Sequence, residues 1–151
     1  MTLVRPAHPA DNAAARALVR RSLGDFGIAA EFDGLDHAIG AFGRSDSPNA
    51  IELAAQCDGV FVACLAIQAN GEGGAKLFGF HVAPEMRGRG VGRALLEAAI
   101  ARARAQGFAA LKLDTWGSMA AAVNLYESLG WRRVADPTPE SGADRSYSLA
   151  L

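Results

Sequence analysis

The chain has 151 residues, half of them hydrophobic, which is enough for one domain with its own core and hardly enough for two. We therefore expect a single domain over residues 1–151. Lys and Arg number 15 against 16 Asp and Glu, so the net charge of −1 gives no general attraction to nucleic acid or to an anionic membrane surface.

The sequence also lacks the signals of membrane insertion and secretion. Its longest apolar stretch, Val60–Ile67, is far shorter than the roughly 20 residues that a membrane span needs. The segment Met1–Arg5 reaches an arginine at once and has neither the apolar block nor the cleavage site of a secretory signal. We expect a cytoplasmic protein without a membrane partner.

In the first half of the chain, one strand signal and one helix signal precede a region with a less regular pattern. Thr2–Arg5 is typical of a strand, and Ala13–Leu23, rich in Ala, Leu and Arg and followed by Gly24, predicts a helix. From Asp25 to Asn49 glycines interrupt short apolar groups, which indicates short helix and loop.

Three strands are predicted next. Ala50–Cys57 and Val60–Ala69 are strand-like runs separated by Asp58-Gly59, a dipeptide that suits a two-residue hairpin turn. These two strands should pair antiparallel. A glycine-rich turn then leads to a third strand, Lys76–Val82.

The second half predicts a strand–helix–strand crossover followed by a further helix and two strands. The expected elements are a helix at Val91–Gln106, a strand at Ala109–Asp114, a helix at Met119–Leu129, a strand at Trp131–Val134, a loop at Asp136–Asp144 and a strand at Ser146–Leu151. Together these elements predict an α/β fold with a mixed, mostly antiparallel sheet and flanking helices.

Cys57 and Cys64 are the only cysteines, and each lies in a strand-like apolar run without a His cluster beside it. We therefore expect no metal site. A disulfide is open on numbers alone, but two small, buried, reduced thiols are the plainer interpretation.

Arginine and glycine alternate just before the long helix, in the run Arg87-Gly88-Arg89-Gly90-Val91-Gly92. At the start of a helix, free backbone N–H groups and the helix dipole both favour a bound anion. Glycines let the backbone touch a phosphate, while the arginines, with Arg93, add donors and charge. A tight turn with solvated arginines is the simpler alternative, but the alternation favours a pyrophosphate site.

Two other phosphate-binding motifs do not fit this segment. The dinucleotide fingerprint G-x-G-x-x-G, counted from Gly88, needs a glycine where the chain has Arg93. The P-loop needs a Gly-Lys dipeptide, which the chain does not contain.

Two sequence blocks carry a family resemblance. The first is Val82-x-Pro84-x-x-Arg87-Gly88-x-Gly90-x-Gly92, which resembles the acetyl-CoA-binding motif of the GCN5-related N-acetyltransferases, or GNAT family. The second, Ala122–Trp131, is similar to their A-x-x-L-Y-E-x-x-G-F signature, with Trp131 in place of Phe. The close resemblance covers Leu77–Val134, whereas the first 75 residues match in layout only.

The resemblance implies a GNAT-type transferase with acetyl-CoA as co-substrate and a sheet whose central strand pair splays apart. The pantetheine arm should pair with the strand backbone at Phe80–Val82, and the pyrophosphate should bind at Arg87–Gly92. Relatives often have a cofactor-contacting Asn at the place of Met119. The implied cofactor-binding residues are Phe80, His81, Val82, Arg87, Gly88, Arg89, Gly90, Val91, Gly92 and Met119.

The resemblance also makes Tyr126 the candidate general acid that protonates the CoA thiolate. The predicted helix directs its phenol inward, together with Met119, Ala122 and Leu129. With a pKa of about 10 against about 8.5 for a thiol, a tyrosine stays protonated at neutral pH and can still donate to a thiolate. A core tyrosine with an ordinary hydrogen bond is the alternative.

The general base is less evident. Many relatives have a Glu at the position of Lys76, and a cation cannot be that base. Asp114 matches a position that holds a catalytic Glu in some ribosomal-protein acetyltransferases of the family, and is our first candidate. His81 is the second, because a His titrates near neutrality, and a water-mediated route is a third option.

The predicted acceptor is the primary amine of a small molecule, acetylated by direct attack in a ternary complex. A protein N-terminus or lysine, a longer acyl chain, a hydroxyl acceptor and a non-catalytic acyl-CoA sensor remain alternatives. Family members often form homodimers, but no stripe in this sequence identifies an interface. The acidic residues Asp25, Glu31, Asp33, Asp36 and Asp46 suit a cationic acceptor and a solvated surface equally.

Overall fold

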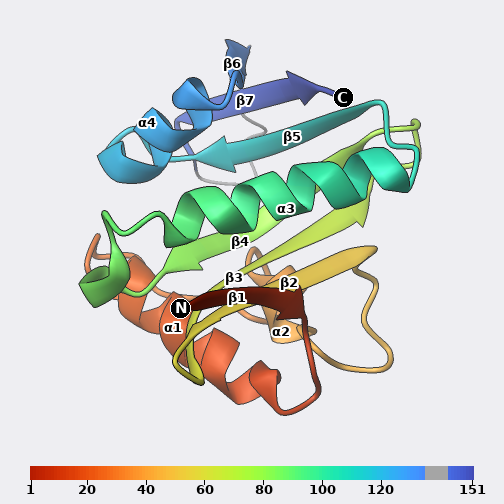
Figure 1. The fold of residues 1–151 in the computed structure, drawn as a ribbon. Coiled ribbons are helices and arrows are strands. Elements are labelled where there is room, and N and C mark those ends of the chain that lie inside the picture. Colours follow the sequence, from red (N-terminus) through yellow and green to blue (C-terminus); the bar gives the residue numbers. More distant parts are fainter. Residues whose placement is uncertain (135–142) are drawn as a thin grey trace.

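The strands and helices follow the predicted order along the chain (Figure 1). A computed structural model describes residues 1–134 and 143–151. Its strands are β1 (Thr2–Pro6), β2 (Ile51–Cys57), β3 (Val60–Ala69), β4 (Ala75–Val82), β5 (Ala110–Thr115), β6 (Arg132–Val134) and β7 (Arg145–Ala150). Its helices are α1 (Asp11–Gly24), α2 (His37–Gly40), α3 (Val91–Ala105) and α4 (Ala120–Ser128), with a 3₁₀ turn, η1 (Pro84–Met86), before α3.

The predicted boundaries lie within about two residues of these bounds, the usual scatter at element ends. The largest shift is at α1, which begins at Asp11 rather than Ala13. The Asp11 carboxylate accepts a hydrogen bond from the backbone N–H of His8 at 2.7 Å and pairs with Arg5 at 2.7 Å, so the chain is already fixed there. The predicted loop Asp136–Asp144 lies for its larger part outside the described residues.

The described residues form a seven-stranded sheet in the order β1-β2-β3-β4-β5-β7-β6. Neighbouring strands are antiparallel except for β4 and β5, which are parallel and are joined by the crossover through α3. The fold class predicted from the sequence is therefore confirmed. At the β2–β3 hairpin, Asp58 and Gly59 both have positive φ, as the two-residue turn requires.

The central strands β4 and β5 diverge soon after they meet. Within the described residues they pair only at Ala75 with Leu111 and at Lys76 with Lys112. Beyond Lys76 the edge of β4 that faces β5 has no strand partner, so the predicted splayed pair is present. An unpaired strand edge offers backbone donors and acceptors to an extended ligand.

Gly79 breaks the alternation of side chains along β4. Its φ of +62° and the register shift between β3 and β4 mark a β-bulge. In a regular strand Phe78 and Phe80 would share a face. Instead the Phe78 ring lies 5.5 Å from that of His37 in α2, and the Phe80 ring lies 5.9 Å from that of Tyr126 in α4. The bulge therefore turns the end of β4 so that α2 and α4 approach it from opposite faces.

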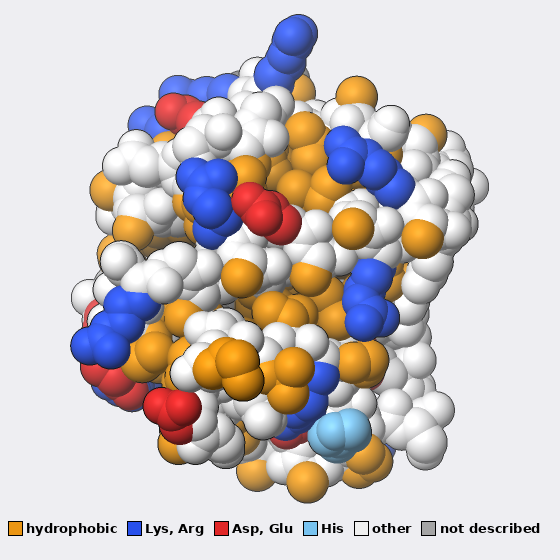
Figure 2. Space-filling view, in the orientation of Figure 1, with side chains coloured by type: hydrophobic (Ala, Val, Ile, Leu, Met, Phe, Trp, Pro, Cys, Tyr) orange, Lys and Arg blue, Asp and Glu red, His pale blue; other side chains and the backbone are white. Residues whose placement is uncertain are grey.

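The surface over α3 carries no single charged patch. Figure 2 shows Lys and Arg side chains scattered on this face among hydrophobic and uncharged ones. No helix in residues 1–134 and 143–151 is long and apolar enough to cross a membrane.

Candidate active site

The segment Arg87–Gly92, which we call the phosphate turn, leads into α3 as predicted. Gly88 and Gly90 have φ of +76° and +80°, and a β-carbon at either would meet no described atom within 4 Å. Glycine is therefore needed there for backbone conformation rather than for space. Gly90 is the N-cap of α3 and no side chain caps it. The first N–H groups of α3 therefore remain available to an anion.

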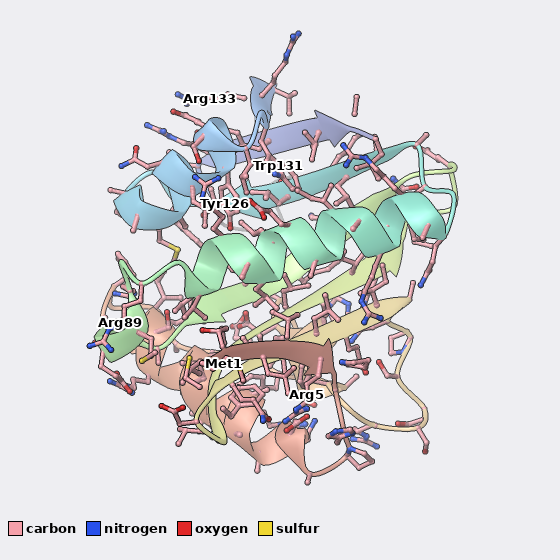
Figure 3. The ribbon with its side chains drawn as sticks, in the orientation of Figure 1. Met1, Arg5, Arg89, Tyr126, Trp131 and Arg133 are labelled. Carbon is pink, nitrogen blue, oxygen red and sulfur yellow. The ribbon has the colours of Figure 1, made fainter. Side chains whose placement is uncertain are left out.

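Gly92 allows α3 to approach its neighbours closely. A β-carbon there would lie 3.2 Å from Cζ of Phe80 and 3.3 Å from Cδ2 of Leu125. Of the nearby arginines, Arg93 donates to Oγ of Ser128 at 2.9 Å, whereas Arg89 is exposed at the outer edge of the turn (Figure 3). The turn thus combines fixed backbone donors with side-chain charge.

A first cavity of about 420 Å³ lies between this turn, the end of β4 and the start of α4. Most residues that the sequence assigned to the cofactor line it: Phe80, His81, Val82, Arg87, Gly88, Gly90, Gly92 and Met119. Arg89 and Val91 do not line it, because Arg89 faces solvent and Val91 is buried in the core.

A second cavity of about 250 Å³ occupies the gap between β4 and β5 and is lined on one side by the loop before α2. It shares Phe80, His81, Met119 and Ala122 with the first cavity. The two cavities therefore meet at the end of β4.

Tyr126 lines the second cavity and is 4% exposed. Three rings surround its own at centroid distances of 5.8–5.9 Å, those of Phe80, Trp131 and Tyr147. Figure 3 shows it between α4 and α3. Its hydroxyl makes no hydrogen bond with the described residues, and burial raises the pKa of the phenol above its ordinary value. Tyr126 is therefore fully protonated at neutral pH.

Asp114 also lines the second cavity, at the point where β5 leaves β4. Its Oδ2 lies 2.8 Å from Nζ of Lys76, and its Oδ1 accepts a hydrogen bond from Oγ of Ser146 at 2.7 Å. The same Lys76 ammonium lies 5.2 Å from the centre of the Phe78 ring. Both carboxylate oxygens are thus engaged by neighbouring side chains.

His81 lies where the two cavities meet. Its Nδ1 is 2.8 Å from Oγ of Ser22 in α1. Burial, with a smaller effect of the Arg87 charge, lowers the pKa of His81 to about 4, so the imidazole is neutral at pH 7. No sequence pattern pointed to Ser22, which lies within the amphipathic helix α1.

The loop before α2 supplies a side of the second cavity that the sequence did not assign. His37 lines it, with Nδ1 3.1 Å from the Gly34 carbonyl oxygen and Nε2 3.3 Å from Oε1 of Gln68. Of the five acidic residues noted in this variable region, all within the described part, Asp36 alone lines either cavity. Burial raises the pKa of Asp36. The acidic bias is therefore mostly a surface feature.

Neither Cys57 nor Cys64 lines either cavity. Cys57 and Cys64 form no disulfide, and burial raises the pKa of the Cys64 thiol to about 12. The described residues contain no group of three or more His, Cys, Asp or Glu side chains that could hold a metal ion.

Comparison with solved structures relates the fold to acetyltransferases. An acetyltransferase of the GNAT family from Staphylococcus aureus Mu50 superposes with a TM-score of 0.88 at 14% identity, over 100% of this chain and 99% of that one. The PaiA N-acetyltransferase of Thermoplasma acidophilum, solved with coenzyme A, gives a TM-score of 0.78 at 17% identity, over 100% and 99%. At such identities the likeness is one of fold.

A closer sequence relative is the ribosomal protein bS18-alanine N-acetyltransferase of Escherichia coli K12. It is 43% identical over 82 residues, which are 51% of this chain and 55% of that protein, so the chain spans about half the length of the curated relatives it matches. The solved E. coli enzyme gives a TM-score of 0.74 at 26% identity, over 100% of this chain and 93% of that one. The model of the acetyltransferase (GNAT) family matches residues 15–131. Because that match covers most of the sequence, the chain belongs to the GNAT family.

Proposed function

We propose that this protein transfers an acetyl group from acetyl-CoA to a primary amine by direct attack, within a single domain over residues 1–151. The observation that carries the proposal is the meeting of the two cavities at Phe80 and His81. One cavity ends at an anion-binding helix start and the other contains a buried, protonated phenol. A donor molecule and an acceptor molecule can therefore meet at the end of β4.

The backbone that lines the first cavity suits coenzyme A. Gly88 and Gly90 adopt positive φ, which brings peptide groups to the surface, and α3 begins without a side-chain cap. These groups would hold the pyrophosphate, with Arg87 and Arg89 adding charge. The unpaired edge of β4 beyond Lys76 would hydrogen-bond the amide groups of the pantetheine arm. When bound, acetyl-CoA supplies the activated acetyl group.

Tyr126 is the proposed general acid, which gives its proton to the departing thiolate. A pKa raised by burial keeps the phenol protonated, and the absence of a hydrogen bond to any described residue leaves its hydroxyl available. The second tyrosine of the chain, Tyr147, is different, because its hydroxyl donates to Oε2 of Glu127 at 2.6 Å.

Asp114 is the proposed first candidate for the base that removes a proton from the amine. Its Oδ2 lies beside the Lys76 ammonium, and each oxygen already accepts a hydrogen bond. A proton from the amine would therefore reach Asp114 through water. His81 was the second candidate from the sequence, but its Nδ1 faces Oγ of Ser22.

The proposed acceptor is a small molecule, because the second cavity has a volume of only about 250 Å³. A protein N-terminal amine is the second candidate, favoured by the match to an enzyme named for the alanine of bS18. An α-amino group has a pKa of about 8 against about 10 for an alkylamine, so it loses its proton more easily in a site without a strong base.

The test combines calorimetric titration with acetyl-CoA and a thiol-release assay against small amines, amino acids and short peptides that begin with alanine. Binding together with thiol release for one acceptor class supports the transferase and identifies the acceptor. Binding without release in any class favours a non-catalytic sensor. No binding of acetyl-CoA contradicts the proposal. Longer acyl-CoAs in the same assay determine the acyl preference.

A further inference from the structure

A buried pair of side chains, Ser22 and His81, joins α1 to the end of β4. The distance from Oγ of Ser22 to Nδ1 of His81 is 2.8 Å, and Ser22 is 3% exposed. The bulge at Gly79 creates this pair, because it turns Phe80 toward α4 and leaves the next residue, His81, directed to α1. The pair belongs to the bulged end of β4, where the two cavities meet.

The polarity of this hydrogen bond follows from the donors and acceptors present. The Ser22 hydroxyl has no other hydrogen-bond partner among the described residues, including the carbonyl groups of its own helix. A buried hydroxyl hydrogen without an acceptor is costly. Ser22 therefore donates its hydrogen to Nδ1 of His81. Nδ1 then carries the lone pair of the ring and not its proton.

The remaining ring proton must be on Nε2. The imidazole is neutral at pH 7, and a neutral ring with an unprotonated Nδ1 has its single hydrogen on Nε2. Nε2 has no hydrogen-bond partner among residues 1–134 and 143–151, while His81 lines both cavities. The group that His81 offers to bound molecules is therefore an N–H donor.

We propose that His81 acts as a neutral hydrogen-bond donor to the thioester carbonyl oxygen, and that Ser22 is the positioning residue that fixes its tautomer. This inference rests on the acetyl transfer proposed above. As the nitrogen–carbon bond forms and the carbon–sulfur bond breaks, negative charge passes through that oxygen, and a fixed donor is most effective where charge develops. The amine proton leaves through water toward Asp114, Tyr126 protonates the sulfur, and His81 keeps its own proton.

This role differs from that of a general base in a way that can be measured. A base needs a lone pair directed at the amine, but the lone pair of His81 is engaged by Ser22. A donor needs only an N–H, which a glutamine amide also provides. Variants that keep or remove the N–H therefore separate the two roles.

The first experiment reads the tautomer without relying on activity. Long-range ¹H–¹⁵N correlation spectra of protein labelled in its histidines are recorded at pH 7, with His81 assigned among the three histidines by its loss in His81→Gln. We expect the Nε2–H pattern in the wild type and its loss or averaging with Nδ1–H in Ser22→Ala. A wild-type Nδ1–H pattern, or a doubly protonated ring, overturns the proposal.

The second experiment compares turnover in two variants that differ in the donor. His81→Ala should lower kcat about 100-fold, whereas His81→Gln should stay within about tenfold of the wild type. Ser22→Thr should rescue the loss in Ser22→Ala, because it restores the hydroxyl. Equal losses in His81→Gln and His81→Ala, with the acidic limb of the pH profile gone in both, would show a base and overturn the donor role. If the wild type binds no acetyl-CoA, the proposed function fails while the spectra still decide the tautomer.

Discussion

The phosphate turn and the second cavity are built in opposite ways. The turn, Arg87–Gly92, is one continuous stretch, exposed from Arg87 to Gly90, whose contribution is backbone N–H groups and positive φ angles. The second cavity takes single side chains from the loop before α2, from β4, from β5 and from α4, several of them hydrogen-bonded to residues far away in the sequence. The part that would recognise the cofactor is thus encoded locally, and the part that would perform chemistry is assembled by the fold.

The bulge at Gly79 connects these two regions. Because side-chain alternation reverses there, Phe78 lines the second cavity alone, whereas Phe80, two positions later, also lines the first cavity and lies close to Gly92 of the phosphate turn. One glycine therefore allows a single strand to serve both regions. Substitutions should accordingly show large effects at buried side chains, intermediate effects at the bulge and small effects at the exposed turn.

The largest effect is expected at Tyr126. The change Tyr126→Phe keeps the ring and its packing but removes the proposed proton donor, so kcat should fall by at least about 100-fold with acetyl-CoA affinity nearly unchanged. Steady-state kinetics and calorimetric titration measure the two quantities. Tyr147→Phe is the matched control, because the Tyr147 hydroxyl donates a hydrogen bond to Glu127 and Tyr147 lines neither cavity. Nearly unchanged turnover in Tyr126→Phe with intact binding would refute the acid role.

The next effect, a loss of stability, is expected at Gly79. In Gly79→Ala the new β-carbon would lie 2.3 Å from Cγ1 of Ile39, and alanine would also keep a φ of +62°. Clash and backbone strain together should lower the free energy of unfolding by about 3 kcal/mol. Urea denaturation measures it. In the control Gly71→Ala, φ is +81° with no described atom within 4 Å, so strain alone should cost about 1 kcal/mol. Equal losses of stability in Gly79→Ala and Gly71→Ala would mean that the Ile39 side chain moves aside and does not fix the bulge.

Acid destabilisation should report the burial of His81. Its pKa is lowered to about 4 in the folded protein, so the unfolded chain takes up the proton first as pH falls below about 6.5. Stability from this group is complete above that pH and is lost toward pH 4, by about 3 kcal/mol. Urea denaturation at pH 7, 5.5 and 4 should show a smaller loss in His81→Gln than in the wild type. Parallel curves would indicate that the ring titrates normally.

The contrast between the two regions also explains what the sequence could predict. The turn was predictable because its signal is six adjacent residues, and the strands and helices were predictable from periodicity and from turn residues such as Asp58-Gly59. Ser22 and His37, the first residue of α2, were not, because their partners are 59 and 31 residues away, and only the folded sheet brings them together. The bulge at Gly79 could have been predicted, because a glycine inside a strand is typical of a β-bulge.

The smallest effect is expected at Arg89, on the exposed side of the turn. Its guanidinium makes no ion pair with the described residues and faces solvent, so Arg89→Ala should weaken acetyl-CoA binding only about threefold. The effect should fade as salt rises, because exposed charges are screened. Calorimetric titration at low and high salt measures it, with Arg102→Ala in the last turn of α3 as a control that should leave affinity unchanged. A loss of 100-fold at Arg89 would place phosphate recognition in the side chains of the turn and not in its backbone.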